Sequence, residues 1–113
     1  MQGYYRMPTV HDGQVVFVSE DDLWSVSLKG GRAQRLTSNL GSVSYPLLSP
    51  DGKWIAFTGR EERVSEIYVM PSEGGTATRL TWHGAACWPV YWKGEKIIFA
   101  SMYGSFSTRE FFL

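Results

Sequence analysis

The chain states one pattern of residues twice and begins it a third time. Each copy contains, in order, a turn glycine, a phenylalanine in an apolar run, a second apolar pair, a Gly-Gly step and Arg-Leu-Thr. The first copy comprises Asp12-Gly13, Phe17, Leu23-Trp24, Gly30-Gly31 and Arg35-Leu36-Thr37, and the second Asp51-Gly52, Phe57, Ile67-Tyr68, Gly74-Gly75 and Arg79-Leu80-Thr81. The third begins with Gly94 and Phe99, and the sequence ends before its Gly-Gly step. The sequence therefore predicts an array of similar units, the last of them incomplete.

The spacing of the turn glycines indicates which kind of array this is. Gly13, Gly52 and Gly94 are 39 and 42 positions apart, a period typical of β-propeller blades. Helical repeats would need apolar residues at three- and four-residue intervals, whereas the runs here are short, rich in β-branched and aromatic residues, and bounded by turn residues. We therefore predict an all-β fold, a β-propeller fragment of about three blades with four antiparallel strands each.

Each predicted unit can be divided into strands. The first unit, about residues 3–37, has strands at 4–10, 14–19, 23–28 and 32–36. The second, about 43–81, has strands at 43–48, 53–58, 66–70 and 76–80. The third, about 87–113, has strands at 87–92, 96–101 and 109–113, and lacks a fourth. Eleven strands are expected where three complete blades would have twelve.

Three prolines indicate which strand of each unit is an edge. Pro8, Pro46 and Pro89 each lie five or six positions before a turn glycine, within the first strand of their unit. Proline cannot donate a hydrogen bond to a sheet, so it belongs on an edge strand. The strand that lines a propeller's central channel is such an edge, and so is the outermost strand. We expect the proline-bearing strands to be the innermost ones.

Two segments near the start are the most specific part of the sequence: Gly3-Tyr4-Tyr5-Arg6-Met7-Pro8-Thr9-Val10 and Val16-Phe17-Val18-Ser19-Glu20-Asp21-Asp22-Leu23-Trp24. They resemble the start of tricorn proteases, and the resemblance covers nearly the whole chain. Less specific matches, shared with TolB-type and prolyl-oligopeptidase-type propellers, include Leu48-Ser49-Pro50-Asp51-Gly52 and Ile67-Tyr68-Val69-Met70-Pro71. Arg63 departs from the family, whose loop often carries glycine at that place.

The resemblance implies a large cytoplasmic peptidase with two propellers, a PDZ-like domain and a serine-hydrolase core. This chain would be about half of the first, six-bladed propeller, which is not catalytic and is thought to filter or channel peptides. No family catalytic residue can be placed on the sequence given. The alternative is a stand-alone interaction module similar to TolB, and the length of the reading frame beyond Leu113 would discriminate the two.

Charge and composition exclude several partners. Eleven basic and eleven acidic residues cancel, so no net field would attract nucleic acid or an anionic membrane. No apolar run is long enough for a membrane helix, and the start lacks the pattern of a secretion signal. The one cysteine, Cys87, fits a reducing compartment. We expect a cytoplasmic location, no nucleic acid or membrane partner, and no cofactor.

Chemically reactive residues are present, but their contexts favour structural explanations. His11 and His83 lie in predicted turns without a second histidine at ligand spacing, and Cys87 lies in a predicted buried strand. None of Ser19, Ser49 and Ser105 sits in Gly-x-Ser-x-Gly, and the acidic groups at 20–22 and 61–62 are expected to be solvated loop charges. We therefore predict no catalytic or metal site.

Two remaining features of the sequence bear on what the chain contacts: its aromatic residues and the two ends of the array. Most of the aromatic residues recur with the repeat, which indicates packing between blades. Tyr4 and Tyr5, with the adjacent Arg6, fall in the predicted innermost strand and are candidates for lining the channel, where peptides could bind. Half a ring would leave two blade faces uncovered. We expect the chain to associate with the rest of its parent propeller or with copies of itself.

Overall fold

The computed structural model describes residues 6–38, 40–60, 64–82, 84, 86–101 and 106–110, and for Arg6 and residues 106–110 it describes the backbone alone. Within this part of the chain all regular secondary structure is β-strand. None of the described residues forms a helix long and apolar enough to cross a bilayer.

The strands form three antiparallel sheets in which chain neighbours are also sheet neighbours. Sheet 1 contains β1 (Arg6–His11), β2 (Gln14–Ser19), β3 (Asp22–Ser27) and β4 (Gln34–Arg35). Sheet 2 contains β5 (Ser44–Leu48), β6 (Trp54–Gly59), β7 (Glu66–Pro71) and β8 (Thr78–Arg79). Sheet 3 contains β9 (Cys87–Lys93), β10 (Lys96–Ser101) and β11 (Phe106–Glu110).

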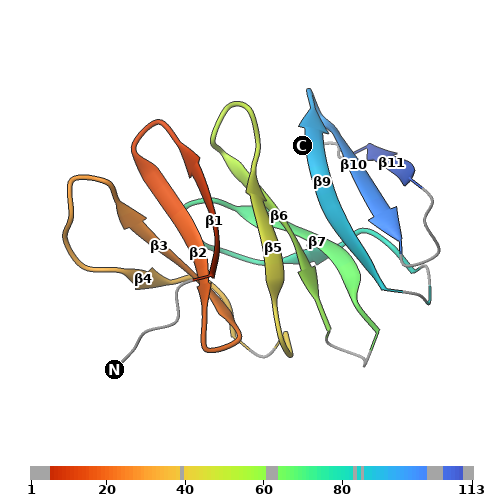
Figure 1. Cartoon of the computed structure of the whole chain (residues 1–113), viewed down its shortest axis with the longest axis horizontal. Helices are drawn as coiled ribbons and strands as arrows, with labels where there is room; N and C mark the ends of the chain where they lie inside the picture. Colours follow the sequence, from red (N-terminus) through yellow and green to blue (C-terminus); the bar gives the residue numbers. More distant parts are fainter. Residues whose placement is uncertain are drawn as a thin grey trace.

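The three sheets lie side by side in chain order (Figure 1). Their first strands β1, β5 and β9 run in the same direction, and the turns that follow them lie at the same edge of the molecule. β5 contacts both β1 and β9, so the first strands are the elements by which neighbouring sheets approach most directly. This confirms the predicted all-β array of blade-like units and its eleven strands, counted over the described residues.

Sheet 2 is buried on both faces because its strands present apolar residues to both neighbours. In β6, Ile55 and Phe57 belong to the core shared with sheet 1, whereas Ala56 belongs to the core shared with sheet 3. All three are fully buried. Side chains alternate between the two faces of a strand, so one continuous apolar run serves two interfaces.

Backbone hydrogen bonds repeat at the two junctions between sheets. The Val43 N–H donates to the carbonyl of Asp21 over 3.1 Å, and the Cys87 N–H donates to the carbonyl of Ser65 over 3.2 Å. In each case the chain entering a new first strand bonds to the second hairpin of the preceding sheet. We call these the junction bonds; they connect consecutive sheets at corresponding places of the two junctions.

The proline-bearing strands are edges, as predicted. β1, β5 and β9 each pair with one neighbour only, and the pairing register of each shifts within the strand. In β1 and β5 the residue before proline, Met7 or Tyr45, has a left-handed backbone with φ of 55° or 53°. Side-chain-bearing residues rarely adopt this conformation.

Two predictions about strands were wrong. The third strand of sheet 3 is β11, Phe106–Glu110, which begins three residues before the predicted 109–113; residues 111–113 lie outside the described residues. Its register with β10 runs from Lys96↔Glu110 to Ala100↔Phe106. The outermost strands β4 and β8 have two residues each, shorter than the predicted 32–36 and 76–80. At these outer edges, side-chain hydrogen bonds, described below, replace the longer run of backbone hydrogen bonds that was expected. The blade boundaries at 3–37, 43–81 and 87–113 stay predictions.

Candidate functional site

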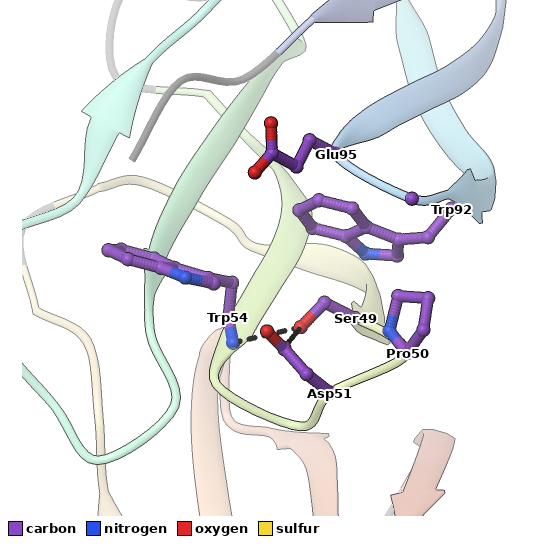
Figure 2. Close-up of a pocket in the computed structure, with 7 residues that line it drawn as sticks. Ser49, Pro50, Asp51, Trp54, Trp92 and Glu95 are labelled. Atoms are coloured by element: carbon purple, nitrogen blue, oxygen red, sulfur yellow. Dashed lines mark hydrogen bonds between the residues drawn. The ribbon is translucent and has the colours of Figure 1, made fainter.

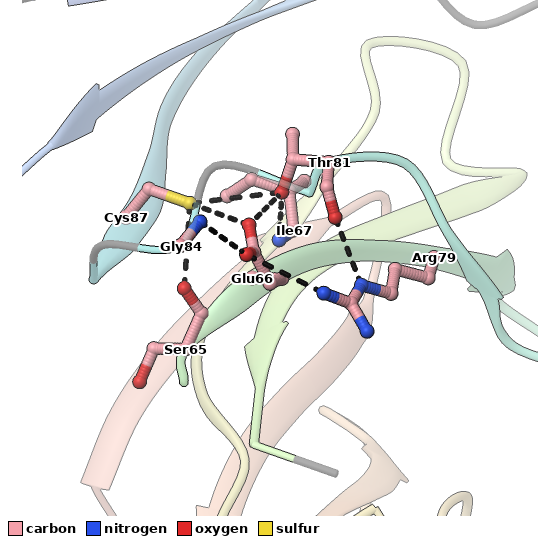
Figure 3. A network of polar contacts seen from close by, with 7 residues as sticks. All are labelled: Ser65, Glu66, Ile67, Arg79, Thr81, Gly84 and Cys87. Carbon is pink, nitrogen blue, oxygen red and sulfur yellow. Dashed lines mark hydrogen bonds and ion pairs between the residues drawn. The ribbon is translucent and has the colours of Figure 1, made fainter. Parts of the chain in front are cut away.

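A buried carboxylate explains why Arg-Leu-Thr recurs. Glu66 begins β7 with 1% of its surface exposed, and its Oε1 accepts a hydrogen bond of 2.6 Å from the Thr81 hydroxyl. Arg79 approaches its Oε2 at 3.4 Å and donates from Nε to the Thr81 carbonyl. The Thr81 hydroxyl in turn accepts from the Ile67 N–H. This outer-strand network ties the end of sheet 2 to its third strand (Figure 3).

Sheet 1 contains the same network with aspartate in place of glutamate. Asp22 Oδ1 accepts from the Thr37 hydroxyl at 2.8 Å, and its Oδ2 pairs with Arg35 at 2.5 Å. The prediction that Asp22 is a solvated loop charge was therefore wrong, since the residue is buried. The signal was present in the sequence: each network acid precedes its arginine by 13 positions, Asp22 before Arg35 and Glu66 before Arg79.

Cys87 is a packed thiol, as predicted. It is fully buried, and its Sγ lies 3.5 Å from the Ser65 carbonyl and 3.6 Å from Glu66 Oε1. Burial, reinforced by the neighbouring Glu66 carboxylate, raises the pKa of the thiol from its ordinary value of 9.0 to about 11. The thiolate, which is the nucleophile, is therefore scarce at neutral pH.

The remaining reactive residues occupy structural positions or lie outside the described residues. Ser49 heads its turn, with its hydroxyl donating to Asp51 over 2.7 Å and accepting from the Trp54 N–H. The Ser19 carbonyl accepts from the Trp24 indole. His11 lies at the end of β1 against Gly52. His83, Ser105 and the acids at 61–62 are among the residues not described. Within the described ranges no three His, Cys, Asp or Glu side chains gather as a metal site.

One surface feature follows the innermost strands. Met7, Tyr45 and Trp88 each immediately precede the proline of β1, β5 or β9. The Tyr45 N–H approaches Met7 Sδ at 3.2 Å, and the Tyr45 and Trp88 rings have centroids 6.1 Å apart. Tyr45 is 46% exposed. We call these three residues the inner-strand row. A search for residues preceding the recurrent prolines would have found them.

The predicted channel-lining residues are only partly covered by the structure. Tyr4 and Tyr5 lie outside the described residues, and for Arg6 the backbone alone is described, at the start of β1. Their place in a channel stays a prediction. The inner-strand row begins one residue after Arg6, on the same strand.

A pocket opens between the turn that follows β5 and the turn that follows β9. Its volume is about 220 Å³. The indoles of Trp54 and Trp92 and the acidic residues Asp51 and Glu95 surround it, with Ser49, Pro50 and Gly94 completing the lining (Figure 2). We call it the turn pocket. These two tryptophans are not among the recurring aromatic positions, and Asp51 and Glu95 are 44 positions apart in the sequence, so no sequence motif connects them.

The free face of sheet 1 carries an apolar cleft of about 360 Å³, lined by Pro8, Val15, Phe17, Val26 and Ala33. The strand registers show that this face of sheet 1 corresponds to the face of sheet 2 that packs against sheet 1. The pair Val15–Val26 of sheet 1 matches the pair Ile55–Met70 of sheet 2, and the pair Phe17–Trp24 matches the pair Phe57–Tyr68. In sheet 2 this face is fully buried against sheet 1.

Comparison with known proteins identifies the class and then the family. The crystal structure of the tricorn protease superposes with a TM-score of 0.79 at 24% identity, covering 88% of this chain and 11% of that one. TolB from Acinetobacter baumannii superposes with a TM-score of 0.63 at 18% identity, covering 90% of this chain and 31% of that one. These likenesses show that the fold is a segment of a β-propeller.

Sequence comparison gives the family. Residues 2–113 match the tricorn protease N-terminal beta propeller domain, and the chain belongs to that family. It is 39% identical to tricorn protease homolog 1 of Streptomyces coelicolor over 109 residues, which are 95% of this chain and 10% of that protein. The chain thus spans about a tenth of the length of that relative.

Proposed function

We propose that this chain is a non-catalytic propeller segment of a tricorn-like serine protease of the cytoplasm, and that it helps to filter or channel peptides to or from a distant active site. Membership of the family supports the parent protein. The inner-strand row supports the passage of peptides, because it places exposed aromatic surface on the strands that border a propeller's axis.

The inner-strand row suits transient contact with an extended chain. Aromatic rings contact apolar side chains without demanding a particular sequence. Val90 and Tyr91 of β9, 44% and 60% exposed, extend apolar surface along the third of these strands. The left-handed backbone at Met7 and Tyr45 costs about 1 to 3 kcal/mol per residue, and such strain clusters at functional sites.

The test uses the protease that contains this segment. We expect Tyr45→Ala to change kcat/KM for a peptide of about a dozen residues by roughly threefold or more, and to leave cleavage of a blocked di- or tripeptide unchanged. Leu28→Ala is the control, because Leu28 is 64% exposed but follows β3, away from the inner strands. Equal changes for both substrates, or the same length effect from Leu28→Ala, would contradict a peptide path.

The alternative, a stand-alone interaction module similar to TolB, gives a different result in this experiment. Tyr45→Ala would then leave the dependence on peptide length unchanged and would weaken binding to a protein partner.

We further propose that the free face of sheet 1 is covered by another blade, either from the rest of the parent propeller or from a second copy of this chain. The support is internal to the molecule. The corresponding face of sheet 2 is covered by sheet 1, through residues such as Val16, Val18 and Leu23. A sheet with a similar small aliphatic face would fit the cleft of sheet 1 in the same way.

A further inference from the structure

The turn pocket combines two features that are usually found together where organic cations bind. Its walls are indole rings, whose faces attract cations, and its rim carries carboxylates. The chain already contains one such contact elsewhere, with the Arg79 guanidinium carbon 5.3 Å from the centre of the Trp82 ring. Small-molecule pockets typically measure roughly 300 to 1,000 Å³. At about 220 Å³ the turn pocket is suited to a single side chain.

Hydrogen bonds hold the walls of the turn pocket in place. Trp92 is 5% exposed, and its Nε1–H donates to the Leu47 carbonyl over 2.9 Å. On the opposite side, the Ser49 hydroxyl links the Trp54 amide to the Asp51 carboxylate. A site that is rigid before binding loses less conformational entropy when a ligand enters.

The acidic groups of the turn pocket are available to a ligand. Within the described part of the chain, the Ser49 hydroxyl and the Lys53 amide both donate to Oδ1 of Asp51, and Oδ2 faces no other residue's donor. The Lys53 amide and the Ser49 hydroxyl also hold the pKa of Asp51 below its usual value, so the carboxylate is charged at neutral pH. Glu95 is exposed and has no hydrogen bond or ion pair within the described part of the chain.

Neighbouring basic residues do not line this pocket. Lys53 lines a different cavity, together with Gln14, Pro71 and Glu73. Lys93 and Lys96 flank Glu95 in the sequence, and neither is part of the lining.

The junction between sheets 1 and 2 shows how the same space looks when a side chain fills it. There the turns after β1 and β5 meet, as the turns after β5 and β9 meet at the turn pocket. His11 and Gly52 occupy the repeat positions that Pro50 and Gly94 occupy at the turn pocket. The His11 ring lies so close to Gly52 that a Cβ added there would be 2.4 Å from Nδ1. An imidazole therefore contacts the glycine at the first junction, whereas proline at the corresponding place of the second leaves a pocket open.

We propose that the turn pocket binds the cationic end of an arginine or lysine side chain, with Asp51 and Glu95 receiving its N–H donors and the indoles contacting its face and stem. The occupant would belong to an extended peptide, and this part of the inference rests on the proposed function. The turns after β1, β5 and β9 gather at one edge of the molecule (Figure 1), and the turns after β5 and β9 line the pocket, so a peptide that reaches this edge would pass close to it.

The experiment uses single blocked amino acids with the 113-residue chain, so that its outcome does not depend on peptide passage. The probe is N-acetyl-arginine amide, and its neutral isostere N-acetyl-citrulline amide is the matched ligand control. The indole N–H signal of Trp92 in a ¹H–¹⁵N spectrum, assigned by its loss in Trp92→Phe, reports binding. We expect a dissociation constant of roughly millimolar size for the arginine probe, about tenfold weaker binding of citrulline, and weaker binding as sodium chloride rises.

Variants locate the interaction. Glu95→Gln should weaken the arginine probe roughly threefold to tenfold, and Asp51→Asn should do the same if its spectrum shows that the turn remains folded. Glu73→Gln is the matched control, since Glu73 is an exposed acid in another turn and does not line this pocket. Glu95→Gln decides the question if Asp51→Asn disturbs the fold.

Several results would overturn the inference. These are equal binding of arginine and citrulline, an unchanged affinity in Glu95→Gln, the same loss in Glu73→Gln, or tighter binding of the neutral sugar methyl glucoside. If the turn pocket failed these tests but Tyr45→Ala still altered the dependence on peptide length, the proposed peptide path would stand and the pocket proposal would fall. If the pocket bound the arginine probe as expected but Tyr45→Ala had no effect on the length dependence, the pocket proposal would stand and the peptide path would be refuted.

Discussion

At the scale of single residues, Glu66 shows how a buried carboxylate can organise the edge of a sheet. A charge removed from water needs several hydrogen-bond donors to offset its lost hydration. Glu66 receives donors from the Thr81 hydroxyl, from Arg79, and from the Gly84 N–H at 3.0 Å. Arg-Leu-Thr therefore recurs because its first and third residues neutralise and orient an acid on the neighbouring strand.

Removing one hydroxyl from this network should be costly. We expect Thr81→Val, which keeps the shape of the side chain, to lower the free energy of unfolding by about 2 to 3 kcal/mol. The Ile67 N–H would lose its acceptor and Glu66 would lose its shortest donor. Urea unfolding followed by tryptophan fluorescence measures the change.

Two further valine substitutions test the reasoning. Thr37→Val removes the matching hydroxyl from sheet 1 and should destabilise somewhat less, because the Arg35 side chain there is 53% exposed and water can replace lost bonds. Thr78→Val changes an exposed residue of β8 and should have little effect. A loss at Thr78 equal to that at Thr81 would refute a specific contribution from the network.

The buried thiol predicts a pH dependence. Because the pKa of Cys87 is about 11 in the folded chain and near 9.0 when unfolded, the unfolded state releases the thiol proton first as pH rises. Stability from the neutral thiol is thus complete below about pH 9 and is lost between about pH 9 and 11. We expect Cys87→Ala to show a shallower decline of unfolding free energy over this range. Parallel declines in the two proteins would contradict the raised pKa.

Residue chemistry was predictable from the sequence where it depended on local pattern. Cys87, within an apolar stretch typical of a strand, was correctly predicted to be buried. Asp22 was misassigned because its neighbours Glu20 and Asp21 are exposed loop acids, and only pairing across to Arg35 distinguishes it. The acids of the turn pocket were missed because Asp51 and Glu95 come together only when two turns, far apart in sequence, are adjacent in space.

At the scale of elements, the strands inside each sheet were the most predictable. β2 has the predicted bounds, because a turn glycine and a loop delimit a β-branched run. The lengths of the outermost strands were overestimated. The alternation of apolar and polar residues continues through Arg-Leu-Thr, but side-chain hydrogen bonds replace part of the backbone ladder there. The left-handed residues before Pro8 and Pro46 were not predicted, since residues preceding proline usually adopt extended backbone.

One connection between elements should be intolerant of any side chain. Gly41 has φ of +68°, and a Cβ there would lie 2.5 Å from the carbonyl oxygen of Arg60, whose own N–H donates to the Leu40 carbonyl. We expect Gly41→Ala to cost the usual 1 to 2 kcal/mol of left-handed strain and roughly 1 kcal/mol or more from the clash. Thermal or urea unfolding measures the loss.

Gly13→Ala is the matched control for this connection. Its φ of +83° is similarly left-handed, but nothing lies within 4 Å of an added Cβ. It should show the strain alone and lose less stability than Gly41→Ala. The reverse order would show that the contact with Arg60 relaxes without cost.

At the scale of the whole molecule, the free face of sheet 1 predicts association. If this face is covered by another copy, the 113-residue chain should form dimers or larger species, and Val15→Asp should shift it toward monomers by placing a charge in the cleft. Size-exclusion chromatography with light scattering gives the mass.

Leu28→Asp is the control for association, because it adds the same charge at an exposed site outside the cleft. It should leave the mass unchanged. A wild-type chain that remains a folded monomer at micromolar concentration would contradict self-association and would leave only the parent's own blades to cover this face.

The junction bonds carry a consequence for how such a chain can evolve. They join amide N–H and carbonyl groups, which every residue type except proline supplies in full, so mutation of the side chains at Asp21 or Ser65 need not abolish them. Amino-acid identity at the hairpins can therefore diverge widely between duplicated units while the backbone contact from one unit to the next is kept.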